Sequence, residues 1–139
     1  MDERDLEVRN RTYRLFVELG RAPTAAEVGP GTSQAWRRLH DEHALVLDAH
    51  GSLLMANPFA AVPTPYRVHA DGRSWYGNCA WDAIGICAAL HADGRVETAC
   101  PDCAGPIVLT IENQRPDDES LRFHCLVPAA HWWDDIVFT

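Results

Sequence analysis

Apolar and charged positions follow a helical period through the first third of this 139-residue chain. Over residues 5–19, apolar side chains recur with charged residues between them, which predicts an amphipathic helix that Gly20 ends. Thr24 and Glu27 have the spacing of a capping box, which predicts a short second helix to about Val28. The chain is therefore expected to open with two helices.

A third helix and a hairpin complete the predicted N-terminal unit. The helix is expected to be capped by Thr32 or Ser33 and to reach His43. Apolar residues 45–47 and 53–55 then flank a short polar loop that contains a glycine, which is typical of a β-hairpin. Three helices followed by a hairpin form a winged-helix-like pattern.

A proline-rich stretch separates this unit from the rest of the chain. Three prolines lie between Asn57 and Pro65, and such spacing favours an extended linker over residues 57–65. We therefore expect two domains, a winged-helix-like module over residues 1–56 and a second domain over residues 66–139.

The second domain shows strand-like apolar runs around a single apolar helix. The helix is expected over about residues 79–90. The candidate strands span residues 66–68, 74–76, 95–99, 107–111, 121–127 and 135–139. One helix against a mainly antiparallel sheet makes the predicted fold α+β.

The charge of the chain bears on its partners. The formal net charge is −8, and all 12 Lys-plus-Arg positions are arginines, which argues against a broad surface for a polyanion. Residues 1–45 hold seven arginines against eight acids, so nucleic acid is not an expected partner. A structural or dimerising role for the winged-helix-like module is favoured over DNA recognition.

The hydropathy pattern shows no segment for a membrane. No apolar run is long enough to span a bilayer, and the first ten residues are too charged for a signal peptide. We therefore expect a cytoplasmic protein without membrane contact, whose oligomeric state the sequence does not indicate.

The stretch Asn78-Cys79-Ala80-Trp81-Asp82 places a thiol and a carboxylate one helical turn apart. If Asn78 caps the helix, Cys79 lies in its first turn, where unpaired N–H groups lower the pKa of a thiol. The charge of Asp82 would partly oppose that effect. Such a pair offers a soft nucleophile and a general acid, although a buried cysteine beside a capping carboxylate has the same spacing.

The chain has five cysteines, an odd number that favours thiol chemistry or metal binding over a disulfide framework. Cys100 and Cys103 form a Cys-x-x-Cys in a Pro/Gly turn. The pair could supply two ligands for zinc or copper, work as a reversible dithiol, or be structural. A closed zinc site would need more ligands, recruited from Cys79, His124 or Cys125.

The remaining candidates have simpler interpretations. Cys87 lies on the apolar face of the predicted helix and is expected in the core. The seven histidines form no recognisable site and are expected at the surface or in packing. Trp132 and Trp133 are expected to close a core, or else to wall an apolar substrate pocket.

The order of these elements and motifs resembles the organomercurial (alkylmercury) lyase family. The similarity covers most of the chain and is most specific between residues 75 and 109. In that family a Cys-x-x-Asp on the catalytic helix carries the reaction, and it falls here on Cys79 and Asp82. A further cysteine, usually regarded as structural, falls on Cys100.

The resemblance implies a reaction and its substrate. The Cys79 thiolate would capture the mercury of R–Hg⁺, a second thiolate would add, and Asp82 would protonate the leaving carbon. Mercury is then substrate and product, small thiols are partners, and no organic cofactor is implied.

One position departs from the family pattern. The family's second catalytic cysteine follows a phenylalanine in a late strand, and the best match is Thr139, where the sequence stops. We therefore expect either a truncated chain or a divergent member. In that case Cys100, Cys103 or Cys125 could take its place if folding brings one of them beside Cys79.

Two other functions stay open at this point. The first is a thiol-based metal-binding protein or sensor without lyase activity, with Cys79, Asp82, Cys100 and Cys103 as candidate ligands. The second is a different cysteine-dependent reaction on another thiol-reactive small molecule.

Overall fold

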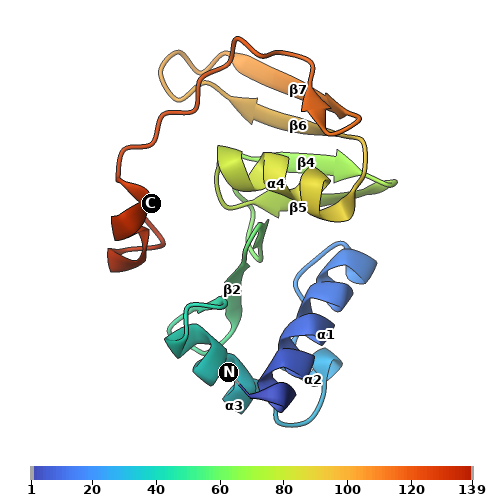
Figure 1. Cartoon of the computed structure of the whole chain (residues 1–139), viewed down its shortest axis with the longest axis vertical. Helices are drawn as coiled ribbons and strands as arrows, with labels where there is room; N and C mark the ends of the chain where they lie inside the picture. Colours follow the sequence, from blue (N-terminus) through green and yellow to red (C-terminus); the bar gives the residue numbers. More distant parts are fainter. Residues whose placement is uncertain (1, 139) are drawn as a thin grey trace.

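The computed structural model describes residues 2–138. Its elements in chain order are α1 (Glu3–Leu19), α2 (Ala25–Val28), α3 (Thr32–Asp41), β1 (Val46–Leu47), β2 (Leu53–Ala56), β3 (Phe59–Ala60), β4 (Arg67–Ala70), β5 (Arg73–Gly77), α4 (Ala80–Leu90), β6 (Gly94–Ala99), β7 (Pro106–Glu112), β8 (Arg115–Pro116) and the 3₁₀ helix η1 (Ala129–Asp134). The helices α1–α3 gather at one end of the molecule and the larger strands at the other (Figure 1).

The caps of the first two helices confirm the sequence predictions. Gly20 ends α1 in a left-handed conformation with φ 67°, which glycine adopts without strain. The backbone N–H of Glu27 donates to Thr24 Oγ1, and the backbone N–H of Thr24 donates to the Glu27 carboxylate, completing the capping box.

The third helix begins and ends differently from the prediction. Gly31 is its N-cap, and Thr32 is already helical, with its hydroxyl donating to the Gly29 carbonyl oxygen at 2.7 Å. His43 lies beyond the end of α3, with φ 60°. The hydroxyl of Thr32 thus hydrogen-bonds to the preceding turn, and no side chain caps this helix.

All strands join one antiparallel sheet in the order β1-β2-β3-β5-β4-β6-β7-β8. This confirms the α+β class. The hairpin β1–β2 is present as predicted, but it continues through β3 into the main sheet. The winged-helix character of residues 1–56 stays a prediction.

Two predicted strands are wrong. Residues 121–127 form no ladder, and residues 135–138 form a bend and turn after η1. Their apolar side chains made them look like strands. Those side chains instead border a cavity beside α4.

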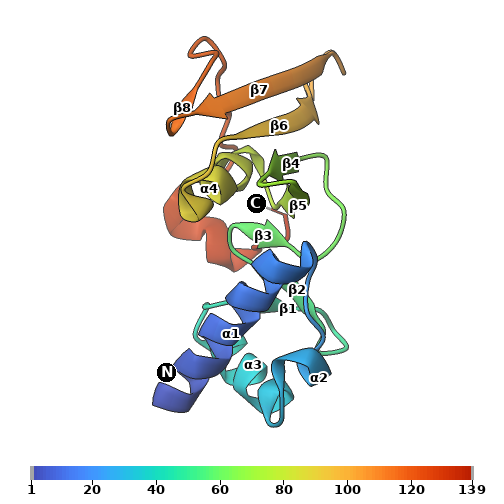
Figure 2. The same cartoon turned by 90° about the vertical axis from the view of Figure 1, so that its right-hand side faces the viewer.

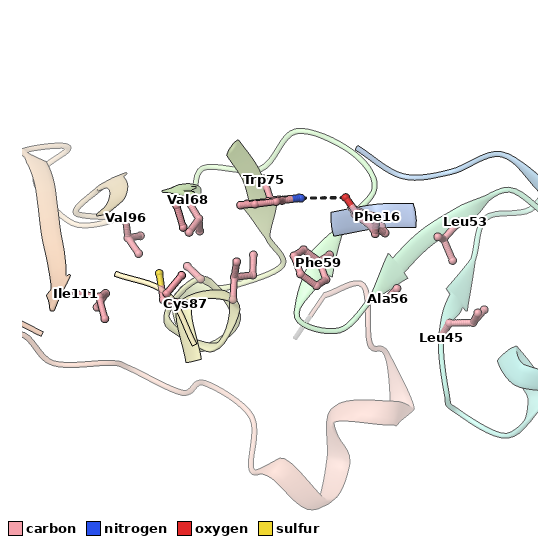
Figure 3. Close-up of a cluster of buried hydrophobic side chains, with 14 of the residues drawn as sticks. Phe16, Leu45, Leu53, Ala56, Phe59, Val68, Trp75, Cys87, Val96 and Ile111 are labelled. Atoms are coloured by element: carbon pink, nitrogen blue, oxygen red, sulfur yellow. Dashed lines mark hydrogen bonds between the residues drawn. The ribbon is translucent and has the colours of Figure 1, made fainter. Parts of the chain in front are cut away.

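Residues 57–65 carry more structure than the predicted linker. They include β3, and Phe59 is 2% exposed. Its ring lies 5.1 Å from that of Phe16 on α1 and 6.1 Å from that of Trp75 on β5, centroid to centroid. The indole N–H of Trp75 donates to the Phe16 carbonyl oxygen at 3.0 Å (Figure 3). One continuous core therefore joins the helices to the sheet, while the division into two domains stays a prediction.

The helix α4 packs on one face of the sheet, against β3, β4, β5 and β6 (Figure 2). Two glycines allow this close approach. A Cβ at Gly77 would lie 2.6 Å from the backbone nitrogen of Ala83, and one at Gly94 would lie 2.7 Å from the Cys87 sulfur. Cys87 is fully buried, as predicted. Within residues 2–138, none of the helices combines the length and apolarity that crossing a membrane requires.

Candidate active site

A cavity of about 310 Å³ opens where the first turn of α4 faces the C-terminal segment. One wall comes from the chain around α4 and β2, and the other from residues 123–138. The lining residues are Met55, Asn57, Tyr66, Asn78, Cys79, Trp81, Asp82, Phe123, His124, Cys125, Leu126, Val127, Trp132, Ile136, Val137 and Phe138. Most of them are apolar, so the cavity suits a small molecule with an organic part.

Cys79 is the N-cap of α4, one position earlier in the helix than predicted. Its backbone is extended, with φ −146°, and its carbonyl oxygen accepts from the Ala83 N–H at 2.9 Å. No side chain caps this helix. Gly77 explains the geometry, because its lack of a Cβ lets the first turn of α4 lie directly on β5.

The Cys79 thiol is not acidified, contrary to the prediction. Burial raises its pKa above the ordinary value and is the largest influence. The backbone N–H groups of Asp82 and Trp81 act in the opposite direction, as expected at a helix N-terminus, while the charge of Asp82 adds to the rise. Desolvation therefore outweighs the donors of the helix end.

The Asp82 carboxyl is held beside Cys79 by Asn78. The side-chain amide of Asn78 donates to Asp82 Oδ2 at 3.0 Å and to Asn57 Oδ1 at 3.0 Å. Burial raises the pKa of Asp82, and the Asn78 hydrogen bond only partly offsets that rise. Asp82 is therefore a carboxyl that keeps its proton to higher pH than an exposed aspartate does.

Asn78 has a different role from the predicted cap, and sequence reasoning missed its partners. Its amide links the start of α4 to Asn57, far back in the chain. Asn57 in turn offers its backbone carbonyl to the Tyr13 hydroxyl at 3.0 Å. The pKa of Tyr13 is raised, chiefly by burial and in small part by the charge of Asp82. A polar chain thus runs from α1 to the carboxyl.

The outer wall of the cavity is held by aromatic contacts. The rings of Trp81 and Phe123 lie 6.5 Å apart, centroid to centroid. The indole N–H of Trp132 donates to the Val127 carbonyl oxygen at 2.8 Å. Trp132 lines the cavity, which was one of the two roles predicted for the tryptophan pair. Trp133 instead stacks on His43 with ring centroids 4.2 Å apart.

The model of one known family matches residues 59–139, more than half of the chain: MerB, alkylmercury lyase. The chain belongs to the alkylmercury lyase family. A solved structure titled "Crystal structure of the mercury-bound form of MerB2" has the same fold, with a TM-score of 0.61 and 21% identity over 81% of this chain. The chain spans 59% of the length of that structure. No curated protein matches the chain.

The Cys-x-x-Cys of this alkylmercury lyase family member lies away from the cavity. Cys100 and Cys103 occupy the turn between β6 and β7, and neither lines the cavity. The pKa of Cys100 is lowered, first by the backbone N–H of Cys103, then by that of Asp102 and by the Cys103 thiol. Within residues 2–138, no three His, Cys, Asp or Glu side chains are grouped to hold a metal ion.

Two further residues concern the family comparison. Cys125 lines the cavity together with Cys79, whereas Thr139, the predicted position of the second catalytic cysteine, lies outside the described residues. His124 also lines the cavity and is exposed, which agrees with its predicted place at the surface. The proximity of residues 121–127 to α4 could not be read from the sequence, because no periodicity marks it.

Proposed function

We propose that this chain cleaves the carbon–mercury bond of small organomercurials, with Cys79 capturing the metal and Asp82 protonating the carbon. One observation carries the proposal: the thiol and the carboxyl line one mostly apolar cavity at the start of α4. Family membership supports it. The mercury-bound state of the structural relative is a property of that protein and supports mercury as the substrate class here.

The first step is exchange of a proton for mercury at sulfur. Cys79 is protonated in the resting cavity because burial raises its pKa. A soft cation displaces that proton, since sulfur binds soft metals as the thiolate. The N–H groups of Trp81 and Asp82 face the sulfur and stabilise the thiolate character that remains in the S–Hg bond.

The second step is proton transfer to carbon. Asp82 is suited to donate because burial raises its pKa, so a larger fraction carries a proton near neutral pH than in an exposed aspartate. Asn78 holds one carboxyl oxygen of Asp82 at 3.0 Å, and Asp82 lines the cavity, so the carboxyl is positioned beside a bound substrate. The hydrocarbon leaves as R–H and mercury stays bound to sulfur.

The test is single-turnover release of benzene from phenylmercury with excess small thiol, with Cys79→Ala as the blank. We expect Asp82→Asn to slow release at least ~100-fold, the usual contribution of a general acid. Asp71→Asn is the matched control, because Asp71 lies in the β4–β5 turn. Release by Asp82→Asn at the parent rate would show that another group donates the proton.

A second candidate function is retention of a soft or borderline ion without bond cleavage. The observation that favours it is the β6–β7 turn, where Cys100 and Cys103 interact directly and Cys103 is exposed. We propose these two thiols as ligands for zinc or copper. Elemental analysis of the purified protein tests it: Cys103→Ser should lower the metal content, and an unchanged content would exclude the turn as a metal site.

A further inference from the structure

The turn between β6 and β7 brings two cysteines together outside the cavity. Cys100 and Cys103 are separated by two residues, over which the chain reverses its direction. The loop that joins β6 to β7 lies at the end of the molecule far from α1–α3 (Figure 1). The two thiols interact directly, and the side chain of Cys103 is exposed. Neither thiol takes part in the proposed cleavage reaction.

Backbone hydrogen bonds hold this turn in one shape. The N–H of Cys100 donates to the Gly105 carbonyl oxygen at 2.8 Å, and the N–H of Ala104 donates to the Cys100 carbonyl oxygen at 2.9 Å. The ladder of β6 and β7 starts directly beside the turn, with Ala99 opposite Pro106. A turn places its first and fourth Cα atoms less than ~7 Å apart, and a disulfide bridges Cα atoms ~4.4–6.8 Å apart. The backbone therefore holds the two cysteines within reach of a disulfide bond.

The pair is complete for disulfide chemistry. In the part of the chain that the structure describes, no group of three His, Cys, Asp or Glu side chains is arranged to hold a metal ion. A structural zinc site takes four ligands, whereas a disulfide takes two sulfurs. The turn thus supplies everything that reversible oxidation of a dithiol requires, apart from the oxidant.

The surroundings of the two thiols distinguish their roles. The backbone N–H groups of Cys103 and Asp102 act on the Cys100 sulfur and lower its pKa, so the thiolate fraction of Cys100 exceeds that of an ordinary cysteine. The thiolate is the nucleophile of thiol–disulfide exchange. Cys103 interacts with Cys100 and is exposed, which suits it to attack a mixed disulfide formed there.

We propose that Cys100 and Cys103 form a thiol–disulfide exchange site that takes a small-molecule disulfide as its oxidant and is reset by small thiols. The Cys100 thiolate attacks one sulfur of RS–SR, which gives a mixed disulfide and RS⁻. Cys103 then attacks the Cys100 sulfur, and the second RS⁻ leaves. The protons of the two protein thiols end on the two RSH products. RS–SR is thereby reduced, and the two protein thiols are oxidised to one disulfide.

The size of the ring favours a reversible bond. The disulfide closes a loop of only four residues, Cys100 to Cys103. Closing so short a loop removes little chain entropy from the unfolded state, so the bond adds little to the stability of the fold. Excess small thiol therefore reopens it by the same two steps in reverse.

The first arm of the test uses the parent protein, freed of metal by a chelator and treated with oxidised glutathione. Free thiols are then alkylated, and tryptic peptides are weighed without reduction. Residues 96–122 form one tryptic peptide, because Pro116 protects the bond before it, and its cysteines are Cys100 and Cys103. We expect this peptide to lose two hydrogens and to regain them when excess reduced glutathione is added.

The second arm assigns the order of attack. Cys103→Ser should stop at the mixed disulfide and carry one glutathione on Cys100, because the second thiol is gone. Cys100→Ser should take up glutathione at least ~10-fold more slowly, because the thiol with the lowered pKa has been removed. Ala104→Gly is the matched control. It keeps both sulfurs, and glycine adopts the φ of 55° found there, so it should close the disulfide as the parent does.

The outcomes separate this site from the lyase function. An unmodified peptide 96–122, or one that carries two glutathiones, would overturn the exchange site, because the two sulfurs would then not join. Faster uptake by Cys100→Ser than by Cys103→Ser would overturn the order of attack. None of these measurements involves mercury, so their results do not depend on whether the chain cleaves organomercurials.

Discussion

The two thiol regions of this chain lie in opposite electrostatic settings. At the start of α4, Cys79 is partly buried next to a carboxyl, and its pKa is raised. At the β6–β7 turn, Cys100 stands beside the exposed Cys103, and its pKa is lowered. Backbone N–H groups face the sulfur in both regions. The sign of the shift is therefore set by what surrounds the donors, and not by the donors themselves.

The difference shows what each region is suited to do. A thiol that stays protonated in a cavity resists oxidation and alkylation, and it exchanges its proton only for a strongly bound soft cation. A thiol that ionises at an exposed turn reacts readily with whatever is in solution. We therefore expect the cavity thiol to be the more selective of the two and the turn thiol to be the more reactive.

The largest expected difference between the two regions is in their tolerance of one added methyl group. Gly77→Ala would bring a Cβ to 2.6 Å from the Ala83 backbone nitrogen, whereas Gly105→Ala would bring one to 3.3 Å from the sulfur of the exposed Cys103 side chain. We expect Gly77→Ala to lower the free energy of unfolding by ~1–3 kcal/mol or more. Gly105→Ala should stay within ~0.5 kcal/mol of the parent. Urea unfolding measures both, and equal effects would show that α4 is not seated rigidly on β5.

The next difference is in thiol reactivity. We expect iodoacetamide to modify Cys100 at least ~10-fold faster than Cys79 at neutral pH, because the pKa of Cys100 is lowered and that of Cys79 is raised, which gives Cys100 the larger thiolate fraction. Mass spectrometry of peptides from briefly treated protein gives the two rates, and the fully buried Cys87 supplies the baseline. Faster modification of Cys79 would mean that the N–H groups at the start of α4 lower its pKa by more than burial raises it.

Much of the fold was predictable from the sequence because local signals decide it. The capping box at Thr24, the glycine stop at Gly20 and the turn between β4 and β5 each specify one conformation. The short strands β3 and β8 were missed, since two residues carry no period. The apolar run over residues 121–127 predicts a strand, but most of its apolar side chains line the cavity and do not pack on a sheet.

The candidate site was predictable only in part, because the sequence reveals only the contacts that are local along the chain. Cys79 and Asp82 are one turn apart on a helix, so their proximity is local. The contact of Asn78 with Asn57, and the position of Cys125 across the cavity, depend on segments that meet only in the folded chain. The direction of the Cys79 pKa shift was predicted wrongly because burial is a tertiary property.

A smaller difference between the two regions concerns the acids that neighbour the two thiols. The charge of Asp82 raises the pKa of Cys79, and that of Asp102 raises the pKa of Cys100, in each case as a secondary influence. Asp82→Asn should therefore speed alkylation of Cys79 at neutral pH by ~2–5-fold. Asp102→Asn should change the alkylation rate of Cys100 by a smaller factor, because water and salt screen an exposed charge. A larger effect at the turn would contradict the assignment of the cavity as the less solvated region.

The smallest expected effect is on stability and its pH dependence. The pKa of Asp82 is raised above its ordinary value of 3.8, so the folded state holds this proton more tightly than the unfolded chain does. The ionised carboxylate therefore costs stability at neutral pH, and that cost disappears as pH falls through the folded-state pKa. Asp82→Asn, whose amide oxygen can still accept from Asn78, should raise Tm at pH 7 by ~1–2 °C. The gain should vanish toward pH ~4, where the parent's carboxyl is protonated too. A gain in Tm that is the same at both pH values would have to come from packing and would show that Asp82 is not desolvated in the cavity.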